Sequence, residues 1–214
     1  MEDIDFATRL HHLLFFPSEY CEPSWLEQSI ESGLFAKLKD CQRTKGRLES
    51  YLCQVLDLPA FVVTQEIGWQ EKLCLMDSVA LTAVLKRLSL IYYSKDIANR
   101  INGKEVRQIR DSLGEDDYRF CVHQAPLMLS AEENIKVFDP AFGTDEYVRG
   151  GLQRLRSIWE ELPPAFLRRL MVKLPITYQE DFLVGDFNLS QQEAKRLLKR
   201  IIRETCPSWR VIFN

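Results

Sequence analysis

The sequence has few of the residues and patterns that mark membrane, secreted or disordered proteins. It holds three histidines in 214 residues, and its formal net charge is only −3. With 46% hydrophobic residues and so little net charge, a chain of this length can bury a sizeable core, which excludes disorder as its main state. The sequence pI of about 5.7 argues against a polybasic nucleic-acid-binding protein, although a local basic patch remains open.

A long uninterrupted hydrophobic run is also missing. The most apolar stretch, residues 73–93, contains Asp77, Lys86 and Arg87. A membrane-spanning helix needs roughly 20 predominantly apolar residues with few charges. The stretch therefore predicts a buried core helix over 73–93 and no direct membrane insertion.

The six cysteines show no C-x-x-C spacing. Residues 1–10 begin with acidic residues and lack both a basic segment and a small-residue cleavage site, so no secretory signal is indicated. Disulfides persist in oxidising compartments. We therefore expect reduced thiols in a cytosolic protein and not a disulfide scaffold.

Nucleotide-binding and hydrolase motifs are absent. A P-loop has the pattern G-x-x-x-x-G-K-[ST], but the one Gly-Lys pair, Gly103-Lys104, has Ala98 in place of the first glycine and Glu105 in place of the hydroxyl residue. Neither G-x-S-x-G nor G-x-G-x-x-G occurs. We nominate no catalytic residue and no cofactor, which leaves a helical enzyme without a recognisable motif as a hypothesis with no candidate residue.

The histidines do not form a metal-binding pattern. His11 and His12 are adjacent, so on a helix they point about 100° apart and cannot hold one ion together. Cys121 and His123 offer two ligands, but no second pair is near them in the sequence. We nominate no metal ligand.

Helical signals run through most of the chain. Apolar residues recur at three- and four-residue steps, and Ser-x-x-Glu capping boxes occur at Ser24–Glu27, Ser130–Glu133 and Ser190–Glu193. No repeat, low-complexity tract or linker divides the chain. The pattern predicts an all-α fold: a single compact multi-helix domain over residues 1–214, in which the branched run at 61–64 allows one short β element near residues 60–66. We expect Gly150-Gly151 to be a flexible point in its helix.

The last predicted helix has two chemically different faces. Its apolar residues form a narrow stripe, and its cations fall on the opposite side. Residues 190–214 contain six basic and two acidic residues, a net of +4, whereas residues 1–70 contain six and eleven, a net of −5. The basic face is either the solvated side of a packed helix or a docking face for an acidic partner. The candidate partner-binding residues are Arg196, Lys199, Arg200 and Arg203.

A second basic segment, residues 96–113, has the form of a helix, an Asn-Gly turn and another helix. It predicts, as an alternative function, a helical nucleic-acid-binding regulator that uses this helix-turn-helix-like segment. Its spacing differs from the usual motif, and Asp96, Glu105 and Asp111 add acids that would repel phosphate.

The order and spacing of several elements resemble the SctK (YscK-type) family of type III secretion systems. The likeness covers most of the chain and is weakest over residues 27–72. The stretches that carry it are Phe16–Tyr20 with Pro23–Leu26, Leu85–Tyr92 with Ile97–Ile101 and on to Leu127, Gly151-Leu152 with Trp159 and Phe166–Pro175, and Leu197–Pro207 with Phe213.

This resemblance implies a non-enzymatic cytoplasmic adaptor of a sorting platform. Such a subunit links the cytoplasmic domain of the SctD-type inner-membrane ring protein to the SctQ-type platform protein, and through it, indirectly, to the SctL-type stator and the ATPase. The expected location is the bacterial cytoplasm at the inner membrane. The role implies two separate docking faces and no nucleic acid.

Overall fold

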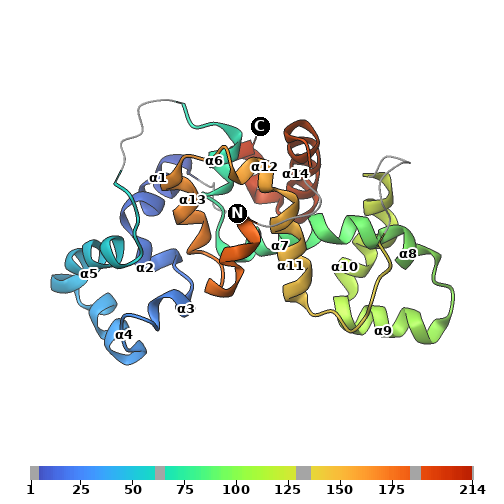
Figure 1. Cartoon of the computed structure of the whole chain (residues 1–214), viewed down its shortest axis with the longest axis horizontal. Helices are drawn as coiled ribbons and strands as arrows, with labels where there is room; N and C mark the ends of the chain where they lie inside the picture. The colour runs from blue at the N-terminus through green and yellow to red at the C-terminus, as the bar shows by residue number, and fades with distance from the viewer. Residues whose placement is uncertain (1–4, 61–65, 129–135, 184–188, 214) are drawn as a thin grey trace.

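The computed structural model describes residues 5–60, 66–128, 136–183 and 189–213, and every regular element among them is helical (Figure 1). The predicted all-α fold is confirmed. The β element predicted near residues 60–66 falls mostly on 61–65, outside the described residues. The α-helices are α1 Phe6–Phe15, α2 Pro17–Tyr20, α3 Pro23–Leu26, α4 Ser32–Asp40, α5 Gln42–Val55, α6 Trp69–Leu73, α7 Ser78–Leu90, α8 Ser94–Asn99, α9 Gly103–Leu113, α10 Glu115–Arg119, α11 Thr144–Arg154, α12 Arg156–Trp159, α13 Pro164–Met171, α14 Gln191–Thr205 and α15 Arg210–Phe213.

Short turns of other helical types join these helices. Four of the described segments are 3-10 turns and one is a π-turn. They are η1 Ile91–Tyr93, η2 Phe120–Gln124 (the π-turn), η3 Ala125–Leu127, η4 Ile176–Phe182 and η5 Pro207–Trp209.

Helix α7 forms the centre of the molecule, with α11 and α14 packed on it. Helix α11 approaches α7 most closely at Gly151, where an added Cβ would lie 2.2 Å from the Leu85 carbonyl oxygen. No side chain fits in that space, so glycine is required for the two backbones to meet. The expectation that Gly150-Gly151 is a flexible point is wrong at Gly151, because this glycine serves a close helix contact.

The continuous helix predicted over 73–93 is also wrong at its beginning. Helix α6 ends at Leu73, and α7 begins only at Ser78. The carboxylate of Asp77 accepts a hydrogen bond from the Ala80 amide at 2.8 Å and caps α7. An acidic side chain is more stable at the positive end of a helix than inside an apolar one, so Asp77 sets the boundary.

The three predicted capping boxes have different outcomes. The box at Ser190–Glu193 is confirmed, with both of its reciprocal hydrogen bonds present at the beginning of α14. The box at Ser24–Glu27 is wrong, because Glu22 caps α3 and accepts a hydrogen bond from the Ser24 amide at 2.8 Å. The box at Ser130–Glu133 lies outside the described residues.

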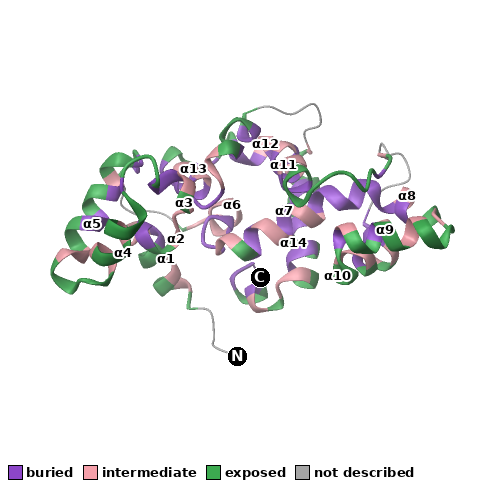
Figure 2. Cartoon of the chain, turned by 90° about the horizontal axis from the view of Figure 1, so that it is seen from below, coloured by how far each residue is buried: buried purple, intermediate pink, exposed green. Residues whose placement is uncertain are grey.

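The buried apolar residues form two clusters. The larger cluster surrounds α7. The smaller cluster joins α3 and α5 to Val172, just after α13. Both views show an elongated molecule with the α4–α5 hairpin at one end and α9 at the other (Figures 1 and 2). No helix among the described residues is long and apolar enough to cross a membrane.

Candidate partner-binding surface

Helix α14 packs on the molecule through the predicted apolar stripe. Each residue of the stripe is at most 1% exposed. Burial of this apolar side fixes the orientation of the helix about its axis, so the opposite side faces solvent. The stripe consists of Ala194, Leu197, Leu198, Ile201 and Ile202.

The four predicted cations of α14 lie together on that exposed side. We call Arg196, Lys199, Arg200 and Arg203 the basic face; all four are exposed. Arg200 donates to the Leu127 carbonyl at 2.9 Å, and Arg196 reaches the Met128 carbonyl at 3.5 Å. These contacts tie α14 to the end of η3, and Leu127 is 69% exposed beside them.

Among the described residues, no carboxylate forms an ion pair with the basic face, although Arg196 is near enough to Glu193 to help lower the pKa of that carboxyl. Every ion pair between described residues involves other cations. Within that part of the chain, the side chains of Lys199 and Arg203 make no hydrogen bond either. Arg210 donates to the Arg203 carbonyl at 2.8 Å and adds one more positive charge at the end of the helix. The result is a solvated cationic surface that is open to an acidic partner.

Two cations in and just after α13, Arg169 and Lys173, have the opposite arrangement and are buried. Arg169 is 2% exposed and donates to the carbonyls of Leu13 at 3.1 Å and Pro59 at 2.9 Å. Lys173 is 3% exposed and donates to the carbonyls of Cys74 and Met76 at 2.6 and 2.7 Å. These side chains join distant segments and offer no surface to a partner.

Helical register was the available signal for this burial. Positions 165, 169 and 173 recur at four-residue steps, a spacing that predicts one side of a helix, and Ala165 is buried on that side. In the structure α13 ends at Met171, and Lys173 lies in the turn after it. Burial lowers the pKa of Lys173 to about 8, and the charge of Asp77 only partly offsets this effect.

In the helix-turn-helix-like segment, three cations are engaged within the chain. Arg100 pairs with Asp96 at 2.8 Å and also donates to the Phe138 carbonyl at 2.7 Å. Arg107 donates to the Gly103 carbonyl, and Arg110 lies 3.6 Å from Glu115. The carboxylates of Asp96 and Glu115 beside Arg100 and Arg110 offset their charge and would repel a phosphate. The nucleic-acid alternative therefore gains no support.

Within the described residues, the cysteines and histidines form no recognisable catalytic or metal site. All six cysteines are free thiols. Burial raises the pKa of Cys74 and of Cys121 to about 12, which keeps these two thiols protonated and unreactive. Among the described residues, no three His, Cys, Asp or Glu side chains are grouped so that they could hold a metal ion.

Comparison with known proteins gives a family. A family profile described as YOP proteins translocation protein K (YscK) matches residues 7–214. The chain belongs to this family. The resemblance proposed from the sequence is thereby confirmed, and the YscK match runs through residues 27–72, where the likeness of individual stretches was weakest.

A solved structure shares the fold of this YscK-family chain. It is described as the cytoplasmic domain of the T3SS sorting platform protein PscK from P. aeruginosa. The two are 21% identical, the match covers 92% of this chain and 94% of that one, and the TM-score is 0.56. No curated protein matches the chain.

Proposed function

We propose that this protein is a non-enzymatic adaptor of a type III secretion sorting platform. The observation that carries the proposal is the YscK match over residues 7–214. It is supported by the fold shared with PscK, which is itself described as a sorting platform protein. The proposed location is the bacterial cytoplasm, at the cytoplasmic face of the inner membrane.

In this role the protein links the cytoplasmic domain of the SctD-type ring protein to the SctQ-type platform protein, and so indirectly to the SctL-type stator and the ATPase. An adaptor needs a stiff body and separate docking faces. The basic face of α14 supports the proposal as one such face, since its cations are exposed and have no carboxylate partner among the described residues. Its partner surface would be acidic.

Charge reversal on α14 tests this role. The variant Lys199→Glu/Arg203→Glu changes the two cations whose side chains make no hydrogen bond within the described part of the chain. We expect it to bind one of the two partners about tenfold more weakly. The two new carboxylates would face the acidic surface of that partner, and attraction would be replaced by repulsion. Binding to the other partner should not change. Isothermal titration calorimetry of the full-length protein with each purified partner measures both.

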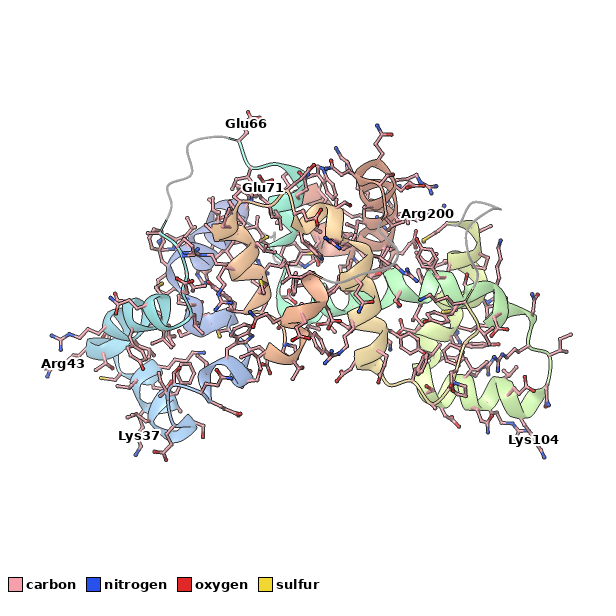
Figure 3. The ribbon with its side chains drawn as sticks, viewed as in Figure 1. Lys37, Arg43, Glu66, Glu71, Lys104 and Arg200 are labelled. Carbon is pink, nitrogen blue, oxygen red and sulfur yellow. The ribbon has the colours of Figure 1, made fainter. Side chains whose placement is uncertain are left out.

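The matched control is Lys104→Glu/Arg107→Glu on α9, which makes the same change of net charge far from α14 (Figure 3). Thermal melting should differ little between the three proteins, since these side chains are exposed. Binding of the wild type to neither partner would contradict the adaptor role. An equal loss in both variants would contradict the role of α14, and duplex DNA binding that α9 reversal abolishes would favour the alternative.

A further inference from the structure

The α4–α5 hairpin at the end of the molecule contains a groove with an apolar floor. The groove has a volume of about 410 Å³, within the range of cavities that hold ligands and side chains. Ile30 and Leu48 lie at its floor, 9% and 4% exposed. Its walls include Leu34, Leu38, Arg47 and Tyr51.

The walls of this groove expose apolar side chains to solvent. No residue of α4 is buried, although the helix carries Leu34, Phe35 and Leu38. Leu34 is 51% exposed and Tyr51 is 41% exposed. A short helix is stabilised mainly by burying an apolar face, so α4 has apolar surface left for another contact.

The α4–α5 hairpin beside the groove has a positive net charge, in contrast to the acidic total of residues 1–70. Five of the six basic residues in that range fall between 37 and 47, together with one acid, Asp40. Lys39 donates to the Ser18 carbonyl at 3.0 Å, and Lys45 pairs with Glu19 at 3.2 Å. The side chains of the other three, Lys37, Arg43 and Arg47, form no ion pair or hydrogen bond within the described residues. Figure 3 shows Lys37 and Arg43 pointing outward at this end.

We infer that this groove binds an amphipathic helix of a protein partner, with apolar side chains at three- and four-residue steps and aspartate or glutamate beside them. The apolar stripe would lie on Ile30, Leu34 and Leu48, and the carboxylates would face Arg47 in the lining and Arg43, which lies one helical turn before it on α5. The lining itself holds one acid, Glu31, and one base, Arg47, so the excess positive charge that favours acids in the partner comes from the cations of residues 37–47 beside the groove. This inference does not rest on the adaptor role.

The shape of the groove favours a helix over a flat membrane surface as its occupant. Two of its apolar residues, Ile30 and Leu48, are recessed at the floor, where the surface of a bilayer does not reach them. A helix presents protruding leucine side chains that enter such a groove. The same chemistry makes lipid binding an outcome to be measured separately.

The test uses the full-length protein and a fluorescent synthetic peptide of about five helical turns. Its leucines recur at three- and four-residue steps, and glutamates flank them. We expect saturable binding by fluorescence anisotropy, about tenfold weaker for Leu34→Asp and for Arg47→Glu. The matched control, Lys104→Glu at an exposed position of α9, should bind like the wild type.

A second peptide, with lysines in place of the glutamates, tests charge complementarity. It should bind the wild type weakly and Arg47→Glu more strongly. The side chains of Leu34 and Arg47 are exposed at the surface of the groove. The circular dichroism spectra and melting temperatures of Leu34→Asp and Arg47→Glu should therefore match those of the wild type. Equal binding of both peptides, or no binding of the acidic one, would overturn the inference. So would a dimer in sedimentation, or capture by anionic phosphatidylglycerol vesicles, that Leu34→Asp abolishes.

Discussion

Lys173 shows how a single buried charge can join distant parts of this fold. Its ammonium group donates to two carbonyl oxygens in the turn before α7 and makes no ion pair within the described residues. It also lies 5.2 Å from the ring centre of Tyr20. Water would solvate the charged form better, so burial favours the neutral amine and the pKa falls to about 8.

The lowered pKa makes a prediction about stability against pH. The unfolded chain keeps the Lys173 proton up to the ordinary pKa of 10.5, whereas the folded protein releases it near pH 8. Between these values the unfolded state binds more protons, so the free energy of unfolding rises with pH. The variant Lys173→Met has no such proton. We therefore expect the stability of the wild type relative to the variant to increase as the pH rises above 8.

Urea unfolding of both proteins at about pH 7, 8 and 9 measures this difference. Buried thiols such as Cys74 have a raised pKa and lose stability at higher pH, but both proteins contain them, so they cancel. A difference that stays constant over the series would show that Lys173 is not buried as described. At neutral pH the variant should be less stable by about 1–3 kcal/mol, because two carbonyls lose their donor.

At the scale of elements, glycines with different surroundings have different roles. Gly151 lies where α11 meets the backbone of α7. Gly46 lies inside α5 with no atom within 4 Å of an added Cβ. The amino-acid type is the same, but the first is required by packing and the second is not.

This contrast predicts opposite effects of one substitution. Gly151→Ala should destabilise the protein by about 1–3 kcal/mol or more, because its methyl group would push α11 away from the Leu85 carbonyl. Gly46→Ala should stabilise it by roughly 0.5–1 kcal/mol, because alanine loses less backbone entropy in a helix. Denaturant titrations of both variants check the signs. Equal effects would contradict the close contact of α11 and α7.

Local signals predicted the two helices and the Asn-Gly turn of residues 96–113. In the structure Asn102 caps α9, and Gly114 ends it with a φ of 85°, a conformation that glycine adopts easily. The beginning of α7 was missed because apolar residues on both sides of Asp77 hide the turn, and a carboxylate in a helical register does not reveal by itself whether it caps or interrupts. The groove was missed because the charge was summed over residues 1–70. In that sum the acids of residues 1–31 outweigh the cations between 37 and 47.

At the scale of the whole molecule, the two apolar clusters are joined through α13 and the residues after it. Val172 belongs to the smaller cluster, while Leu170 and Leu174 belong to the larger. The Trp25 indole N–H donates to the Leu174 carbonyl at 2.7 Å, and Arg168 donates to Leu56 at 2.8 Å. Unfolding one cluster would remove buried partners from the other.

We therefore predict a single cooperative unfolding transition, as one domain over residues 1–214 requires. Trp25 reports on the smaller cluster, and the other three tryptophans, Trp69, Trp159 and Trp209, report on the larger. In urea, tryptophan fluorescence of the wild type and of Trp25→Phe should give the same midpoint as far-UV circular dichroism. Separate midpoints would mean that the α3–α5 end unfolds by itself and forms a second unit.

The sequence by itself determined the all-α class and the two faces of α14, because helical periodicity and capping act over a few neighbouring residues. The order and spacing of its stretches also resembled the YscK family, which the family profile confirmed. The tertiary structure decided which cations are available. Arg169 and Lys173 in the α13 segment and Arg196 and Arg200 on α14 all lie in mixed basic and apolar stretches, yet the first pair is buried and the second exposed. Burial depends on segments far away in the chain, such as the carbonyls of Leu13 and Cys74, and no local pattern records where those segments will pack.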